Sequence, residues 1–541
     1  MIELGRLKRW LAVLLGLSGL LVGLLVLRQA ADAILRAATG ADPASIFNEP
    51  PAPPSELLEV LDWLPDTPRD GRQMEPATRR TITDAYARAL SALDRSGRGD
   101  VDAPLREYLG GSALGAALEA AGDERTIESS TFHLRQQLTL EFYSDDGAVV
   151  AVSAPGVEIV RVVGDRAATP SRVVWSDEAW RFVMILEDGN WRLHQLEIVA
   201  VDDHPPAAGG ARLDQQLDGV NSVTVNDLDP TWRSYDPAVG AVELDHVLAL
   251  GLDTVRVFIA GPEAEPVDTG AITSFLDLAA ERDISVVPVL FDGSADHGVG
   301  NWRLDRDYLD HVVGNLAGHP AIVMWDLKNE PDLDDDRSGG ARIVDAWLDR
   351  IGSEVRRIDP STPVTVGWSS PDHARRGLRV VDVVSFHHFG DADSLEVAIG
   401  ETEAAIGDRQ LVVSEFGRPA WVGFIRGNQP AAQSEAVGEL VEVIEADDLA
   451  GSMVWVLRDP DRAIEPGLVA ARASVSYGLF EADGTERPVA ATIRTGGDQV
   501  ADPGLTELIR SGLTLTTLLA ISIVAAALAV VWRRRLRLIE T

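Results

Sequence analysis

The sequence predicts an α/β fold: a (β/α)8 TIM barrel preceded by a smaller α+β domain and flanked by two transmembrane helices. Between residues 211 and 498, eight apolar runs alternate with helical stretches, which is typical of parallel strands joined by crossover helices. Residues 75–204 change from a helical period to a period of two, which indicates helices followed by antiparallel strands. Two uncharged segments, 10–27 and 513–532, are close to the length that crosses a bilayer.

The composition excludes some classes of partner and site. The 541 residues carry a formal net charge of −37; of the 48 basic residues, two are lysines, Lys8 and Lys328, and 46 are arginines. So acidic a surface repels phosphate groups, which argues against nucleic acid as a partner. The chain has no cysteine, so disulfides and thiolate metal sites are excluded.

Residues 1–34 are expected to form an amino-terminal membrane anchor. The uncharged run 10–27 follows Arg6, Lys8 and Arg9, and it is longer than the roughly 7–15 apolar residues of a secretory signal. A cleaved signal peptide is the alternative, because small residues follow the run.

A second transmembrane helix is expected at residues 512–532, followed by a basic cytoplasmic tail at 533–541. Four arginines lie within the first five residues of that tail. Basic residues thus flank the chain-terminal end of both spans, and the positive-inside rule puts both termini in the cytoplasm. This predicts a cell-membrane protein whose residues 35–510 are extracytoplasmic.

Residues 35–74 are expected to be a stiff linker, because seven prolines occur between positions 41 and 74. The α+β domain at 75–204 ends in LEDGNWRLHQLEIV (186–199). This segment resembles the last hairpin of the cone-shaped nuclear-transport-factor-2-like (SnoaL-like) group. Such folds often have a pocket, but no convergent catalytic set is visible here. A structural role, or binding of a membrane partner protein, is therefore expected for this domain.

The eight apolar runs of the barrel domain (211–498) are the candidate strands. They lie at 220–225, 253–259, 284–291, 321–327, 363–368, 381–387, 410–414 and 452–457. A doubly wound open sheet is the alternative, but no glycine-rich phosphate-binding motif follows the first strand.

Functional residues of such barrels lie at the carboxyl ends of the strands. Reading those ends in order gives Asn226, Arg256, Asp292, Asn329, Glu330, Trp368, His387, His388, Glu415 and Trp455. Strand ends meet solvent, which explains one or two polar residues, but not Arg256 inside TVRVF or a glutamate closing VVSEF. Two carboxyl groups across one barrel mouth are what glycoside hydrolysis needs, one as proton donor and one as nucleophile.

Several motifs carry a family resemblance. WDLKNEPDL (325–333) and SEFG (414–417) resemble the clan-A glycoside hydrolases, with the closest likeness to the cellulase and β-mannanase group around family 5. ALGLDTVRVF (249–258), VSFHHF (384–389) and YGLFEADGTERP (477–488) support it. The resemblance covers roughly residues 215–490, and its motifs occur in the expected order.

The resemblance implies a retaining enzyme with Glu330 as acid/base and Glu415 as nucleophile. It also implies that Asn329 hydrogen-bonds the sugar 2-hydroxyl, a contact that strengthens in an oxocarbenium-like transition state. Arg256 would bond the nucleophile and keep it ionised.

Other residues are expected to line the sugar site. His387 would lie beside the nucleophile, and Trp455 would stack on the sugar in the innermost subsite. Asn226, Asp292, His297, Trp368, His388, Trp232 and Trp302 are further candidates; Trp368 alternatively packs in the core, His388 alternatively faces solvent, and Trp325 is expected in the core. No cofactor or metal is expected, because the histidines show no ligand spacing.

The sixth strand departs from the family pattern. Family 5 usually has His-x-Tyr there, and the tyrosine hydroxyl bonds the nucleophile; this chain has Phe389 at the matching position. Either another hydroxyl substitutes, such as that of Tyr477, or the chain belongs to a divergent subgroup.

The sequence therefore favours a membrane-anchored retaining glycosidase acting on a β-linked poly- or oligosaccharide. Two alternatives stay open: a non-catalytic carbohydrate-binding or scaffold barrel, and a transglycosylase in cell-surface polysaccharide assembly.

Overall fold

The computed structural model describes residues 51–66, 73–122, 128–164, 170–202, 210–264, 266–421, 427–461 and 476–496. It divides the chain into two compact units, Met1–Asp203 and His204–Thr541. The two expected membrane spans, at 10–27 and 513–532, lie outside the described residues. Within the described ranges, no helix is both long enough and apolar enough to cross a membrane.

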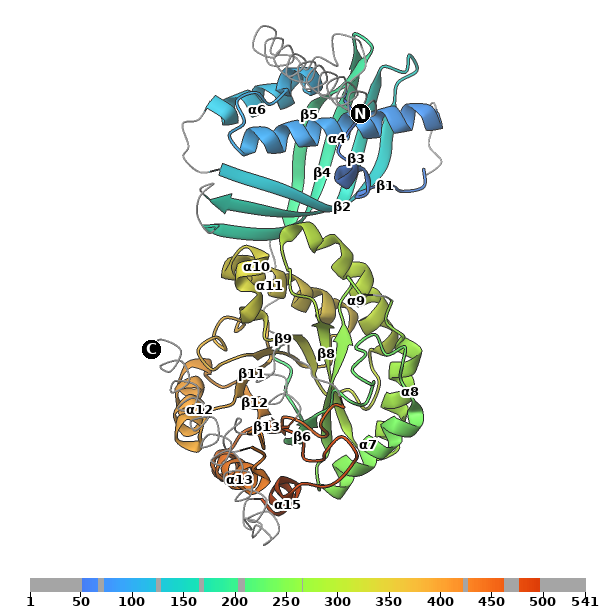
Figure 1. The fold of residues 1–541 in the computed structure, drawn as a ribbon. Coiled ribbons are helices and arrows are strands. Elements are labelled where there is room, and N and C mark those ends of the chain that lie inside the picture. The colour runs from blue at the N-terminus through green and yellow to red at the C-terminus, as the bar shows by residue number, and fades with distance from the viewer. Residues whose placement is uncertain are drawn as a thin grey trace, which may run out of the picture. The chain divides into compact units, whose positions relative to one another are not determined.

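The main part of the first unit consists of helices followed by four antiparallel strands, as expected. The helices are α4 (Pro76–Gly97), α5 (Leu105–Tyr108) and α6 (Gly111–Gly122). The strands that follow are β2 (Glu128–Tyr143), β3 (Val149–Gly164), β4 (Arg172–Glu187) and β5 (Asn190–Asp202). They pair in sequence order, and α4 and α6 lie across the sheet (Figure 1).

Alternating apolar residues build the core of this unit. The inward-facing side chains of the strands pack against α4, where the Tyr86 ring stacks on Phe182 with centroids 4.1 Å apart. Between β4 and β5, Asp188 and Gly189 both have positive φ angles. Such a two-residue turn matches the twist of the two strands that it joins.

Part of the segment expected as a linker is ordered. Residues Ser55–Leu58 form α3, and Leu61–Trp63 form β1, which pairs in parallel with β2. Leu61 is buried in the core, and Trp63 Nε1 donates a hydrogen bond to Thr83 Oγ1 at 2.9 Å. The proline content of this region did not reveal these apolar anchors.

The second unit contains a closed barrel of eight parallel strands in the order β6–β13 (Figure 1). The strands are β6 (Leu217–Asn221), β7 (Thr254–Ala260), β8 (Ser285–Asp292), β9 (Trp325–Asn329), β10 (Val364–Trp368), β11 (Val383–His388), β12 (Gln410–Phe416) and β13 (Gly451–Val454). The barrel prediction is confirmed, and the open-sheet alternative is excluded because β13 pairs with β6.

Helices separate most of the barrel strands, β10 and β11 being joined without one, and they surround the barrel (Figure 1). They are α7 (Pro237–Ala249), α8 (Thr269–Ala280), α9 (Arg303–Leu316), α10 (Asp335–Ser338), α11 (Ala341–Ile358), α12 (Ala392–Ile406), α13 (Pro430–Ala446) and α15 (Pro488–Thr495), with short 3-10 turns η1 (Val299–Asn301) and η2 (Pro331–Asp334). Three begin at an aspartate whose carboxylate accepts from a backbone N–H of the first turn: Asp236, Asp268 and Asp391.

Candidate active site at the carboxyl ends of the strands

Arg256, on β7, is the centre of a buried polar network. Its Nη1 donates to Glu415 Oε1 at 2.6 Å and to Asn221 Oδ1 at 2.8 Å. Its Nη2 donates to Asn329 Oδ1 at 2.8 Å, and Nε and Nη2 donate to Asp326 Oδ2 at 3.1 and 2.9 Å. Burial alone would lower the pKa of Arg256, but the two carboxylates outweigh it and raise that pKa.

Glu330, His387 and Glu415 come together across the barrel mouth. His387 Nδ1 lies 2.9 Å from Glu330 Oε1 and 3.6 Å from Glu415 Oε2. One ligand atom from each of the three side chains lies within 4.8 Å of the others. The Glu330 side chain is 27% exposed and that of Glu415 only 5%, so Glu330 is the carboxyl group closer to solvent.

These three side chains could also ligate a cation, since each offers a nitrogen or oxygen donor at short range. Arg256 already bonds one of the two carboxylates, which reduces the negative charge left for an ion.

The pKa values of the two glutamates move in opposite directions. Burial raises the pKa of Glu415 and outweighs the lowering by His387 and Arg256. Burial also raises the pKa of Glu330, but the hydrogen bond and charge of His387, together with the charges of Arg256 and Lys328, lower it by more, so the pKa of Glu330 lies below the ordinary value. The substrate-free site therefore favours the ionised form of Glu330 while His387 donates to it.

Gly367, on β10, leaves room for the network. A Cβ at this position would lie 2.8 Å from Arg256 Nη2, 2.9 Å from His387 Nε2 and 3.0 Å from Asp326 Oδ2. Its carbonyl also accepts a hydrogen bond from Glu330 N at 2.7 Å. The missing side chain therefore permits the guanidinium and the imidazole to approach the strand.

Two of the expected sugar contacts are partly exposed at this mouth. Asp292 ends β8, and burial raises its pKa although Lys328 and Arg256 lower it. Trp455 directly follows β13 and meets the Phe258 ring edge-on, with centroids 6.0 Å apart. Both side chains remain available to a ligand.

Three expected contacts are instead used by the protein itself. Asn226 is 3% exposed, and its Nδ2 donates to Phe258 O at 3.4 Å. Trp368 is 1% exposed, so it packs and does not line the cleft. The His388 ring nitrogen Nε2 lies 3.1 Å from Asp391 O at the start of α12, and burial lowers the pKa of His388.

Three more distant candidates are also buried. Trp232 and Trp302 are both fully buried, with Nε1 donating to Phe258 O and to His297 O. The expectation that they form outer-subsite platforms was wrong, because a stacking platform needs an exposed face. His297 is 3% exposed and stacks on Trp347 at 3.8 Å. Trp325 is buried, as predicted.

Three residues of the site were missed. Asn221 bonds Arg256 because β6 ends at residue 221, whereas the apolar pattern placed the strand at 220–225 and so pointed to Asn226. Asp326 was hidden within the apolar run of β9, although a charge inside a buried strand is itself a signal. Lys328, also on β9, donates from Nζ to Asn329 O at 2.7 Å.

Phe389 follows β11 and lies edge-on to Tyr477, with ring centroids 5.8 Å apart. A Cβ on Gly417 would lie 3.5 Å from Tyr477 Cδ1. The tyrosine therefore lies close to the end of β12, where Glu415 is located. That its hydroxyl replaces the one lost at Phe389 stays a prediction.

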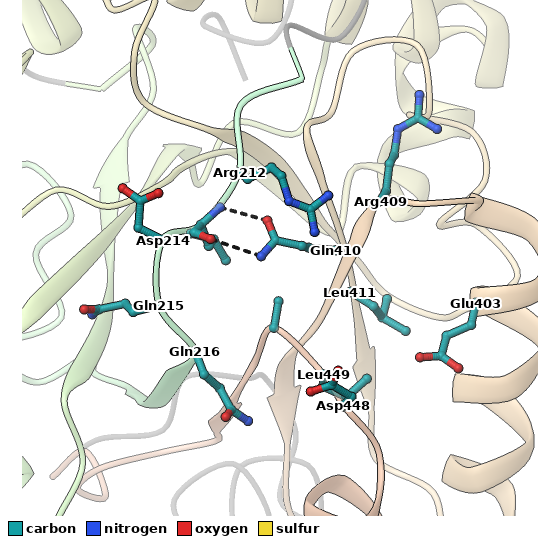
Figure 2. Close-up of a pocket in the computed structure, with 12 residues that line it drawn as sticks. Arg212, Asp214, Gln215, Gln216, Glu403, Arg409, Gln410, Leu411, Asp448 and Leu449 are labelled. Carbon is teal, nitrogen blue, oxygen red and sulfur yellow. Dashed lines mark hydrogen bonds between the residues drawn. The ribbon is translucent and has the colours of Figure 1, made fainter.

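A polar hollow of about 350 Å³ lies at the opposite end of the barrel (Figure 2). The Gln410 side chain bridges the backbone of Leu213, accepting from its N at 2.8 Å and donating to its O at 3.1 Å. Gln410 begins β12, so this hollow is at the amino ends of the strands, away from the glutamate pair.

No protein-family profile matches the chain. Among curated proteins, β-glucuronidase of Homo sapiens is 26% identical over 126 residues, 21% of this chain and 18% of that protein. β-Glucuronidase of Paenibacillus borealis is 24% identical over 170 residues, 28% of this chain and 27% of that protein. The chain is similar to glycosidases. It spans only about a fifth to a quarter of the length of these two relatives.

The chain also has remote likenesses among solved structures. GH5_18 from Streptomyces cattleya in complex with GlcNAc has a TM-score of 0.45 and 18% identity, over 53% of this chain and 80% of that chain. β-D-Glucuronidase of Dictyoglomus thermophilum has a TM-score of 0.41 and 16% identity, over 68% of each chain. These structural likenesses are remote, so the barrel assignment rests on the strand order itself.

Proposed function

We propose that this protein is a retaining β-glycoside hydrolase with Glu330 as acid/base and Glu415 as nucleophile. The proposal rests on the positions of these two carboxyl groups at the ends of β9 and β12. One carboxylate oxygen of Glu330 lies within 4.8 Å of one of Glu415. Retaining enzymes hold their carboxyl groups about 5–5.5 Å apart, whereas inverting enzymes need roughly 6.5–9.5 Å to admit a water molecule.

The contacts of each glutamate support its role. Glu415 is bonded at Oε1 by the permanently charged Arg256, which favours a carboxylate, and its Oε2 is left to attack the anomeric carbon. Glu330 has no such guanidinium contact and is the more exposed of the two. When His387 is neutral, its Nδ1 can accept a hydrogen bond from protonated Glu330.

The reaction follows in two displacements. Glu330 donates its proton to the glycosidic oxygen as Glu415 Oε2 bonds the anomeric carbon and the leaving group departs as an alcohol. The ionised Glu330 then takes a proton from water, whose oxygen displaces Glu415 and restores both carboxyl groups. Asn329 uses Oδ1 to accept from Arg256, so its Nδ2 is free to donate to a sugar hydroxyl. Trp455 offers an aromatic face to the ring.

The substrate is a β-linked poly- or oligosaccharide, and the location is the cell membrane. Residues 10–27 and 513–532 would anchor the barrel outside the cytoplasm. The unit ending at Asp203 would act as a structural or partner-binding module, for which the nuclear-transport-factor-2-like resemblance and the helix-then-sheet order are the support.

The test is hydrolysis of a panel of aryl β-glycosides, with the configuration of the first product followed by NMR. Glu415→Gln should reduce kcat/KM by at least about 10³-fold, and azide should restore turnover of Glu415→Gly. Glu354→Gln is the matched control, because Glu354 is a buried glutamate on α11 bonded by Arg306 and Arg357. Full activity of Glu415→Gln, or an α-configured first product, would refute the proposal.

Transfer to a sugar acceptor uses the same first step. The proposed double anchoring would favour this second candidate, since an enzyme tethered at both ends would act on polymer made at its own membrane. Addition of acceptor oligosaccharides would then give longer products in place of free sugar. Binding of polysaccharide without any turnover would instead identify a non-catalytic barrel.

A further inference from the structure

Lys328 stands out because it is the only lysine among the described residues and lies next to the Asn329–Glu330 pair. It is almost fully buried, with a side chain 7% exposed. Burying a long cation is unfavourable unless it is paired and hydrogen-bonded. Its Nζ donates to Asn329 O at 2.7 Å and lies 3.4 Å from Asp334 Oδ2.

The hydrogen bond from Lys328 is accepted by the peptide group that joins Asn329 to Glu330. The N–H of that peptide, Glu330 N, donates to Gly367 O on β10 at 2.7 Å. The carbonyl of that peptide, Asn329 O, points away from β10. The pairing between β8 and β9 joins Val289 to Asp326, three residues before Asn329, and does not extend to this carbonyl. Lys328 therefore supplies the donor that the neighbouring strand no longer provides, and both polar atoms of the peptide are held.

This matters because Glu330 has a left-handed backbone, with φ 47° and ψ 50°. A residue other than glycine adopts that conformation only when its surroundings impose it. The carbonyl of Glu330 is also fixed, as it accepts from Leu333 N at 3.1 Å. The restraints on either side set the direction in which the Glu330 side chain leaves the strand.

The Lys328 ammonium group is itself positioned by its ion pair with Asp334. Asp334, its carboxylate partner, also lies 3.2 Å from His297 Nε2. His297 in turn stacks on Trp347 of α11 at 3.8 Å. The chain of contacts thus connects the helix layer to the peptide before Glu330.

We infer that Lys328 is a positioning residue for Glu330, holding the acid/base carboxyl in the direction needed to protonate the leaving group. The inference rests on the proposed function. A purely structural lysine would affect folding or all substrates equally, whereas a positioning residue affects only the steps that need the proton.

The experiment compares two glycosides of one sugar: a dinitrophenyl glycoside, whose leaving group needs no proton, and an alkyl glycoside, whose leaving group must be protonated. Lys328→Met should lower kcat/KM by about 10- to 100-fold on the poor leaving group, the range expected for a misplaced acid. On the dinitrophenyl glycoside the loss should be less than about 3-fold. Glu330→Ala should show the same difference between the two substrates more strongly.

Arg356→Met is the matched control. Like Lys328, Arg356 donates to a backbone carbonyl and to a carboxylate, here Val380 O and Asp382 Oδ2. These two acceptors lie just before β11 begins, at the amino end of the barrel. This variant should lose stability without any change in the ratio of the two kcat/KM values. Asp334→Asn provides a second test if Lys328→Met does not fold, with a smaller shift in the same direction.

The outcomes separate the inference from the proposed function. If the unmodified protein hydrolyses both substrates and Lys328→Met loses the same factor on each, or nothing, the positioning role is wrong while the glycosidase proposal stands. If the unmodified protein hydrolyses neither substrate, the proposed function fails and the inference fails with it.

Discussion

Gly367→Ala is the sharpest test of how the barrel mouth is assembled. The added Cβ would lie 2.8 Å from Arg256 Nη2 and 2.9 Å from His387 Nε2. Contacts this short require the neighbours to move. The strand cannot yield easily, because the backbone at Gly367 is paired with both β9 and β11. The guanidinium and the imidazole must therefore shift by several tenths of an ångström.

The size of the effect follows from the contacts at risk. Overpacking of this kind costs about 1–3 kcal/mol. Displacing Arg256 also weakens its hydrogen bonds to Glu415 and Asn329, each worth about 1.5–3 kcal/mol between charged or polar partners. We expect the free energy of unfolding to fall by about 2–4 kcal/mol. Since Arg256 bonds Glu415, the proposed nucleophile, kcat/KM should fall by about 10²-fold or more.

The assay pairs urea unfolding with kcat/KM on the best aryl glycoside, per folded protein. Gly400→Ala is the control, since its Cβ would meet nothing within 4 Å in the middle of α12; it should stabilise by up to about 1 kcal/mol. If Gly367→Ala retained both stability and activity within twofold, the account of a crowded guanidinium site would be refuted.

Three other predictions concern charge. His387→Gln should move both limbs of the pH profile of kcat/KM to higher pH, because His387 lowers the pKa of both glutamates; an unchanged or downward-shifted profile would contradict this. His133, whose pKa burial and then Arg161 lower from 6.5 to about 4, stays neutral on folding. Its contribution is complete above pH 6.5 and is lost as pH falls toward 4. The loss is at most about 3 kcal/mol, since the partly exposed ring is screened by solvent. Urea midpoints at pH 7 and 4.5 should show it, and His133→Gln should show a smaller difference. Arg350→Met removes the cation 3.1 Å from the buried carboxylate of Asp305, so unfolding should become easier by about 3 kcal/mol while kcat/KM per folded protein stays unchanged; undiminished stability would show the pair to be unimportant.

Much of the fold could be read from periodicity. Strands buried on both faces are continuous apolar runs, and the intervening helices keep a 3.6-residue period, so the β7, β8 and β10–β12 runs were located to within about two residues. The β6 strand was displaced because its carboxyl end is followed by further apolar residues. That displacement alone moved the expected contact from Asn221 to Asn226.

The sequence by itself determined the barrel, most of its strand ends and the candidate glutamate pair, because these depend on local patterns and on short motifs. Only the tertiary structure decided which polar residues meet. Arg256 contacts residues 35 to 159 positions away, and a one-dimensional pattern has no information about side-chain direction at a strand end. The structure also showed that Trp455 is partly exposed whereas Trp232, Trp302 and Trp368 are buried. The sequence could not show this, since exposure is set by packing between elements. The physical reason is that a parallel barrel brings all its carboxyl ends to one mouth, where side-chain volume and charge, not chain position, decide the contacts.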